Sequence, residues 1–197
     1  MKKFRISYNA PVVLTFALIA VGVHLLPDSY KHFFVMRPQL ESIEDFFALF
    51  THIVGHGNWD HLLSNFTMIL LLGPILEERH GSRSLVAMIL ATSLVTSLLN
   101  LFIFKDVVLG ASGIVFMFIL LASTANLRKR EIPLTFIAVA VLFLGRELVA
   151  IFENDQISQM AHLIGGVVGA IFGFIGANSN GSAVLSPPKA TKSSSIS

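Results

Sequence analysis

The chain has 197 residues, of which 54% are hydrophobic and 13% are charged. Soluble domains carry roughly 25% charged residues, so this composition excludes an ordinary soluble domain and indicates an integral membrane protein. The formal net charge is only +2, and the absence of cysteine excludes disulfides, thiolate metal sites and a cysteine nucleophile.

Six segments are apolar enough to cross a bilayer. They cover about residues 11–26, 61–76, 84–104, 112–127, 133–152 and 160–177. They predict an all-α fold, a polytopic six-helix membrane bundle within residues 1–178, followed by a disordered cytoplasmic tail over 179–197, where Ser, Pro and Lys dominate.

The first segment resembles a signal peptide, because Lys2, Lys3 and Arg5 precede it. Pro27, Asp28 and Ser29 do not form a small-x-small cleavage pattern, which favours a retained helix. With a cytoplasmic N-terminus, ten basic residues fall on the inner side and four on the outer side. This asymmetry predicts that both termini are cytoplasmic and, in the absence of an organelle-targeting extension, indicates a bacterial inner membrane.

The segment 27–60 between the first two helices is long and rich in aromatic residues. A connection of this kind is expected either to fold against the bundle or to lie in the lipid interface. An interfacial anchor and a functional role both remain open for it. No internal repeat and no pair of broken helices of the transporter type is evident.

Polar side chains head three of the predicted helices. Ser112 begins the fourth helix, His162 lies near the head of the sixth, and His61 and Asn65 share one face of the second. Ser112, His162 and His61 each lie fifteen residues before an expected inner helix end, at Leu127, Ala177 and Leu76. Fifteen residues span roughly 22 Å of helix, so the three side chains are expected at a common depth below the outer surface.

A serine, an imidazole and hydrogen-bond donors at one buried level are the components of acyl-transfer chemistry. Ser112 would be the nucleophile and His162 the general base of a dyad. His61, Asn65 and the backbone N–H of Ser112 would stabilise an oxyanion. No carboxylate at this depth is available to orient His162.

Glycines surround these residues. Gly110 permits a sharp turn into the fourth helix, and Gly113 leaves space beside the hydroxyl. Gly165, Gly169 and Gly173 form a stripe of small residues that favours close approach of another helix, for which the fourth is the natural partner. Taken singly, the serine also fits a packing residue, the histidine an interface residue, and the His61/Asn65 pair a structural hydrogen-bond network.

Three motifs together resemble those of the rhomboid intramembrane serine proteases. They are Gly110-Ala111-Ser112-Gly113, the pattern Ala161-His162-x-x-Gly165-x-x-x-Gly169, and His56-x-x-x-x-His61-x-x-x-Asn65. The run Glu77-x-Arg79-x-Gly81-Ser82 resembles the turn after the second helix of that family. The ordered set covers about residues 46–177 and is specific, although each motif alone is loose.

The resemblance implies an endopeptidase that cleaves transmembrane segments of single-span or polytopic membrane proteins within the lipid bilayer, near their outer ends, with His56 in a supporting role. It also implies that the fifth helix with the loop 153–159 forms a lateral gate. Two positions depart from the family: Phe47-Ala48 replaces a Trp-Arg pair, and Phe116 replaces a tyrosine, keeping a ring that can stack on His162.

Several residues allow more than one interpretation. Arg146 and Glu147 fit either an interfacial pair or a gating role. His52, His56 and His61 could be read as a metal site, but they have no carboxylate partner, so we expect neither a metal nor a cofactor. Nucleic-acid binding is not expected, and the oligomeric state stays open. The competing functions are a catalytically silent, rhomboid-like adaptor that binds transmembrane helices, and a transporter or channel.

Overall fold

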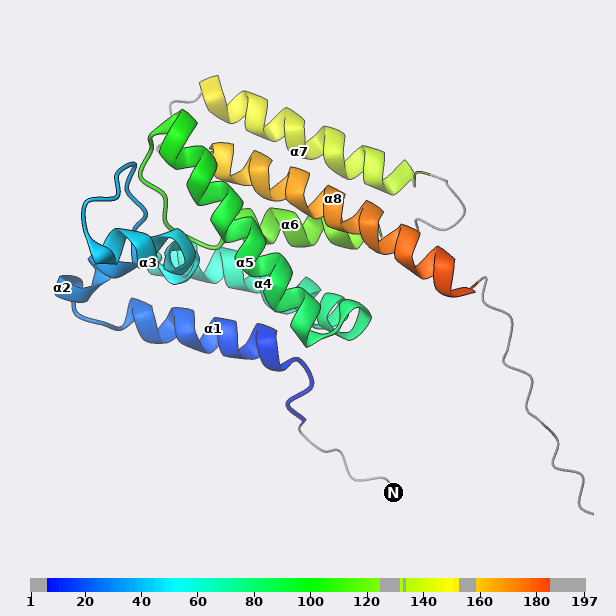
Figure 1. Cartoon of the computed structure of the whole chain (residues 1–197), viewed down its shortest axis with the longest axis horizontal. Helices are drawn as coiled ribbons and strands as arrows, with labels where there is room; N and C mark the ends of the chain where they lie inside the picture. Colours follow the sequence, from blue (N-terminus) through cyan, green and yellow to red (C-terminus); the bar gives the residue numbers. More distant parts are fainter. Residues whose placement is uncertain (1–6, 125–131, 133, 153–158, 185–197) are drawn as a thin grey trace, which may run out of the picture.

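The computed structural model describes residues 7–124, 132, 134–152 and 159–184, and these residues are almost entirely helical (Figure 1). The α-helices are α1 (Pro11–His24), α2 (Asp28–Lys31), α3 (Ile43–Thr51), α4 (Trp59–His80), α5 (Ser82–Leu99), α6 (Ser112–Ser123), α7 (Leu134–Phe152) and α8 (Gln159–Val184). Short 3-10 turns occur at His32–Phe34 and His52–Val54, and a π-helical turn at Asn100–Phe104 follows α5. The all-α prediction is confirmed.

Each of the six predicted segments coincides with one longer helix, but several ends differ. Helix α4 runs from Trp59 to His80 rather than over 61–76, because Asn58 caps its start by accepting the backbone N–H of His61 at 2.8 Å. Helix α6 ends at Ser123 instead of residue 127. Helix α8 continues to Val184, past the expected end at 177, and the rest of the predicted tail lies outside the described residues.

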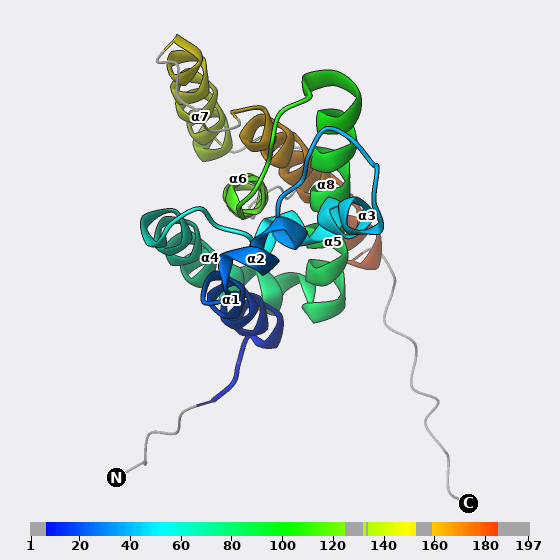
Figure 2. The same cartoon turned by 90° about the vertical axis from the view of Figure 1, so that its left-hand side faces the viewer.

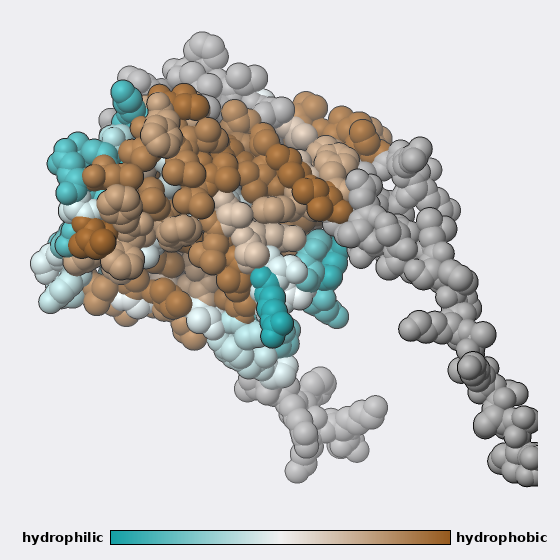
Figure 3. Space-filling view, viewed as in Figure 1, coloured by the Kyte–Doolittle hydropathy of each residue, from teal (hydrophilic) through white to brown (hydrophobic). Residues whose placement is uncertain are grey.

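Among the described residues, two helical stretches are both long and apolar enough to cross a membrane: α4, and α5 with its π-helical continuation to Phe104. Helices α1 and α6 and the stretch Ala161–Ile175 of α8 are apolar but shorter. The surface carries a broad apolar band between two hydrophilic ends (Figure 3). Such a band is what a bilayer requires of a protein that it surrounds.

Helix α6 occupies the middle of the bundle, where it is seen end-on among its neighbours (Figure 2). It packs most extensively against α8 and also against α4, α5 and α7. Its side chains Met117, Phe118 and Leu121 are completely inaccessible to solvent. A helix that is apolar on every side is expected in such a central position. The position of Ser112, at the start of α6, is therefore fixed by packing against α4, α5, α7 and α8.

The connecting segment, defined here as residues 25–58, folds against the bundle, which was one of the two expected arrangements. Its helix α3 begins with a capping box in which Ser42 and Asp45 cap each other. The hydroxyls of Ser93 and Ser97 on α5 donate to the carbonyl of Leu49 at 3.0 and 2.9 Å. Helix α3 is therefore fastened to the C-terminal half of α5.

A carboxylate from α4 caps the start of α1. The Oε1 and Oε2 atoms of Glu77 accept the backbone N–H groups of Val12 and Val13, each at 3.1 Å, and Oε1 also accepts the Ser82 hydroxyl at 2.7 Å. Helix α1 has no local side-chain cap. Glu77 is buried, and its negative charge lies where the helix dipole favours an anion.

Candidate active site

Ser112 is the first residue of α6 and follows a turn that requires glycine. Gly110 has a φ of +113°, which side-chain-bearing residues rarely adopt. A Cβ atom at this position would lie 2.7 Å from the His61 ring and 3.7 Å from the Asn65 amide nitrogen. The turn before the serine thus packs directly on the two residues of α4 that were predicted to lie beside it.

The loop 105–111, called here the serine loop, takes its backbone partners from the connecting segment. Met36 and Val108 exchange both N–H···O bonds at 2.9 Å in an antiparallel bridge. The N–H of Gly110 donates to the carbonyl of His52 at 2.9 Å, and the N–H of Ala111 to Nε2 of His56 at 3.4 Å. Attachments at residues 108, 110 and 111 thus hold the chain up to the residue before Ser112.

Asn100 holds the other end of this loop, a role that the sequence reasoning missed. Its amide nitrogen donates to the carbonyl of Asp106 at 2.6 Å, and its amide oxygen accepts the N–H of Asp106 at 3.1 Å. Asn100 is buried at the π-helical turn, and Lys105 after it is left-handed, with φ 61°. Asn100 was missed because a side chain that bonds to the backbone of one other residue belongs to no motif and to no helical or strand periodicity that a sequence would show.

His162 lies on α8 beside the start of α6. Its ring and that of Phe116, one turn after Ser112, have centroids 4.5 Å apart at an interplanar angle of 34°. The expected stacking of Phe116 on His162 is therefore confirmed. A Cβ at Gly113 would lie 3.1 Å from the carbonyl oxygen of Ala161, the residue before His162.

The glycine stripe of α8 packs on α6 as expected. A Cβ at Gly165 would overlap the backbone of Gly113, and one at Gly169 would lie 2.8 Å from the Cα of Met117. A Cβ at Gly173 would overlap the side chain of Thr124. Only glycine allows the two backbones to come this close, and this contact brings His162 to the serine end of α6.

Two buried polar atoms near the serine have no hydrogen-bond partner among the described residues. They are the amide nitrogen of Asn65 and the hydroxyl oxygen of Thr96 on α5. A buried donor without a partner costs about 1–3 kcal/mol, and such atoms call for a functional explanation. Asn65 was predicted as a donor, whereas Thr96, whose hydroxyl lies 3.8 Å from a Cβ built at Gly113, was not.

The imidazoles of His52 and His56 in the connecting segment are neutral at physiological pH. Complete burial lowers the pKa of His52 to about 4. Burial also lowers the pKa of His56 to about 4, with smaller contributions from the neighbouring His61 and His24. The Nδ1–H of His56 donates to the carbonyl of Val54 at 3.2 Å, which leaves Nε2 as the acceptor that the Ala111 N–H needs.

The helix ends on which the common-depth argument relied are not where the sequence reasoning expected them. Leu76 and Ala177 lie within α4 and α8, and Leu127 is outside the described residues. The proximity of the site residues rests instead on direct contacts with Gly110, Gly113 and Phe116. Equal depth in a bilayer stays a prediction.

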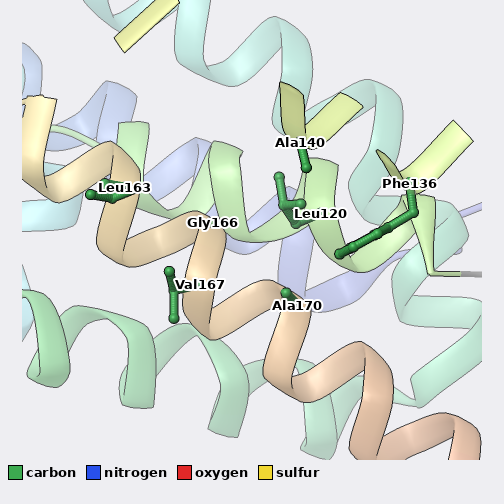
Figure 4. Close-up of a pocket in the computed structure, with 7 residues that line it drawn as sticks. All are labelled: Leu120, Phe136, Ala140, Leu163, Gly166, Val167 and Ala170. Atoms are coloured by element: carbon green, nitrogen blue, oxygen red, sulfur yellow. The ribbon is translucent and has the colours of Figure 1, made fainter. Parts of the chain in front are cut away.

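Helix α7 lies at the edge of the bundle, where it contacts α6 and α8 and lines a hollow of about 140 Å³ together with them. Phe136 and Ala140 of α7 face Leu120 of α6 and Leu163 and Val167 of α8 across this hollow (Figure 4). Nearly all of the expected gate loop and the side chains of Arg146 and Glu147 lie outside what the structure describes. Within its described part, the chain has no group of three side chains suited to a metal ion.

A family model for the Rhomboid domain matches residues 44–179, well over half of the chain. The chain belongs to the rhomboid family. The predicted family is therefore confirmed. Because rhomboids are membrane proteins, the predicted membrane character is confirmed as well. Members of this family are generally serine proteases. The matched range contains every residue assigned to the candidate site.

Three relatives were found. Rhomboid protease GlpG of Haemophilus influenzae is 21% identical over 183 residues, which cover 89% of this chain and 95% of the relative. Rhomboid-like protein 11, chloroplastic, of Arabidopsis thaliana is 28% identical over 79% of this chain and 54% of the relative. Rhomboid-related protein 1 of Caenorhabditis elegans is 31% identical over 72% of this chain and 42% of the relative. This rhomboid thus matches nearly the whole length of the bacterial protease and about half of the two eukaryotic relatives.

Proposed function

We propose that this rhomboid is an intramembrane serine endopeptidase that uses Ser112 and His162 as a catalytic dyad. The observation that carries the proposal is the convergence of three elements on the start of α6. The serine loop contacts His61 and Asn65 through Gly110, while Phe116 stacks on His162 and Gly113 meets Gly165. A packing role for Ser112 alone would not require these polar neighbours.

In this mechanism His162 takes the hydroxyl proton as the oxygen of Ser112 attacks the scissile carbonyl carbon. The oxyanion of the tetrahedral intermediate receives hydrogen bonds from the His61 ring, the Asn65 amide and the backbone N–H of Ser112. His162 then protonates the leaving amine, and the acyl-enzyme forms. A water molecule, deprotonated by His162, releases the second product and restores the Ser112 hydroxyl.

The serine loop fixes the position of Ser112 relative to the other residues of the site. A misplacement of about 1 Å at a reacting atom can cost a hundredfold in rate. The attachments of Gly110 and Ala111 to His52 and His56 hold the N–H of Ser112 at one position. His56 and Asn100 are therefore positioning residues, and they act through the backbone.

We further propose that the chain passes through the membrane six times, once at each of the six longer helices with its flanking residues, with both termini cytoplasmic, in a bacterial inner membrane. The distribution of basic residues and the match to nearly the full length of a bacterial protease support this assignment. Substrates would be transmembrane segments of other membrane proteins that approach past α7. The hollow beneath α7 and its position at the edge of the bundle support that route.

The decisive experiment reconstitutes the purified chain in liposomes with a set of single-span membrane proteins. The same assay is run with Ser112→Ala and His162→Ala. We expect cleavage by the wild type and a loss of at least a thousandfold in each variant. Cleavage that survives both substitutions would refute the dyad, and binding of helices without cleavage by any form would favour the adaptor.

A fluorophosphonate probe, which reacts with an activated serine, tests the nucleophile and the base separately. We expect the probe to label Ser112 in the wild type and to label it much more slowly in His162→Ala. Ser123→Ala, which removes a hydroxyl at the far end of the same helix, is the matched control and should label normally. Labelling at the same rate with and without His162 would contradict its role as the base.

A further inference from the structure

An apolar recess of about 680 Å³ opens on the surface between α1, α5 and the connecting segment. Phe16 and Ile19 line it on α1, Val86 and Leu90 on α5, and Phe50 and Ile53 on the connecting segment. Ile19, Val86 and Leu90 are between 39% and 50% exposed. The recess is distant from α7, and the proposed proteolysis does not use it.

The few polar side chains in the wall of the recess already have partners. The hydroxyl of Thr15 pairs with that of Tyr8 at 2.9 Å, and that of Thr51 donates to the carbonyl of Phe33 at 2.7 Å. The Ser82 hydroxyl donates to Glu77. The wall therefore offers an occupant no free hydrogen-bonding group, and a hydrocarbon chain is the chemistry that fits it.

The length of the recess distinguishes a lipid chain from a transmembrane helix. The lining residues span Pro11 to Ile19 on α1 and Ser82 to Leu90 on α5, about 12 Å of helix in each case. Beyond Leu90, α3 covers α5 through the bonds of Ser93 and Ser97 to Leu49. One leaflet has a hydrocarbon thickness of about 15 Å, whereas a spanning helix needs about 30 Å, so the recess suits one leaflet only.

Positively charged side chains lie next to the end of the recess at Ser82. Arg83 directly follows Ser82, Arg79 lies on the preceding turn, and both are exposed. Within the described part of the chain neither arginine forms an ion pair. The carboxylate of Glu77 is buried and is bonded to the N–H groups of Val12 and Val13 and to the Ser82 hydroxyl. The exposed charged side chains here are therefore two arginines and Glu78, with one net positive charge between them. A guanidinium binds a phosphate group through paired hydrogen bonds.

We propose that this recess binds an acyl chain of an anionic glycerophospholipid from the cytoplasmic leaflet, with the lipid phosphate at Arg83. The choice of leaflet rests on the topology given under the proposed function. Ile53 and Val54, which line the recess, lie between His52 and His56. A bound chain would therefore support the part of the connecting segment that holds the serine loop.

The test blocks the recess after folding. The chain has no cysteine, so Leu90→Cys can be purified in detergent and then modified with benzyl methanethiosulfonate. Native mass spectrometry counts retained dipalmitoyl phosphatidylglycerol before and after modification. We expect one tightly retained lipid and at least a tenfold loss on modification. Val95→Cys, at an exposed position on the same helix outside the recess, should retain the lipid. Equal retention in modified and unmodified Leu90→Cys would overturn the site.

The headgroup is tested with phosphatidylcholine, which has the same chains but no net charge. We expect weaker retention of phosphatidylcholine, and Arg83→Gln should lower phosphatidylglycerol retention to the same level. Lys105→Gln, at the opposite end of α5, should have no effect. Equal retention of both lipids by the wild type would overturn the anionic headgroup.

A disulfide-linked dimer of Leu90→Cys in vesicles of both lipids would instead assign the recess to a second copy of the chain. None of these measurements depends on protease activity.

Discussion

Two histidines of the connecting segment hold the serine loop: the neutral ring of His56 accepts the Ala111 N–H, and the backbone carbonyl of His52 accepts the Gly110 N–H. His52 is fully buried, and its Nδ1–H donates to the carbonyl of Ala48 at 3.0 Å while its own carbonyl accepts the N–H of Gly110. Protonation would place an unpaired positive charge in the core. The site is therefore sensitive to acid even without a change at Ser112 or His162.

The stability of the protein should fall as the pH decreases from 6.5 to 4. In this range the unfolded chain binds a proton at His52, whereas the folded chain, with a pKa of about 4 against an ordinary value of 6.5, does not. The difference corresponds to about 3 kcal/mol, and the loss levels off below pH 4. Thermal unfolding in detergent between pH 7.5 and 4 measures it.

His52→Gln should be less stable at neutral pH but should lose less stability in acid, because one of the two histidines whose pKa is lowered to about 4 has been removed and only His56 of that pair still titrates. His32→Gln, which changes an exposed histidine of the same segment, should keep the full acid dependence. An unchanged pH dependence in His52→Gln would show that His52 is not the titrating group.

At the scale of elements, the contact between α6 and α8 depends on the absence of side chains. Gly165→Ala should destabilise the protein by about 1–3 kcal/mol and lower proteolytic activity further, because the added methyl group meets the backbone of Gly113. Gly22→Ala on α1, where a Cβ would meet nothing within 4 Å, should be neutral or stabilising. Thermal unfolding and the cleavage assay together test the pair. Equal effects of the two substitutions would refute the close contact.

The cap of α1 by Glu77 predicts a second matched pair. Glu77→Gln replaces one acceptor oxygen by an amide nitrogen that faces the N–H groups of Val12 and Val13. A loss of about 1–3 kcal/mol is expected, measured as a lower midpoint of thermal unfolding. Glu78→Gln removes an equal charge from the exposed neighbour and should change the midpoint little. If Glu78→Gln were the more harmful change, the cap would not be the stabilising feature.

Sequence reasoning located the long helices because apolar runs are readable without tertiary contacts. It missed the short helices α2 and α3, although the Ser42 and Asp45 pair that caps α3 is a recognisable local signal. It also began α4 at His61 and overlooked Asn58 as the cap. Around the candidate site, the motifs singled out residues that the structure brings together, and their catalytic roles stay a prediction. Asn100 and Met36 were not singled out, because their partners lie on other elements and have no fixed spacing.

At the scale of the whole molecule, the proposed topology places Arg83 and Lys105 on opposite sides of the membrane, at the two ends of α5. Single cysteines at these positions in the cysteine-free chain test this with a membrane-impermeant maleimide. In inside-out vesicles Arg83→Cys should react and Lys105→Cys should not, and in intact cells the pattern should reverse. Reaction of both cysteines from one side would contradict a membrane-spanning α5.

The cap of α1 also bears on how the chain assembles during synthesis. Val12 and Glu77 are 65 residues apart, so α1 leaves the ribosome and enters the membrane well before its cap has been translated. Until α4 has been made, the first turn of α1 lacks the carboxylate that accepts its N–H groups in the folded chain. We therefore expect α1 to reach its final position only when α4 packs against it, which couples the assembly of the two helices.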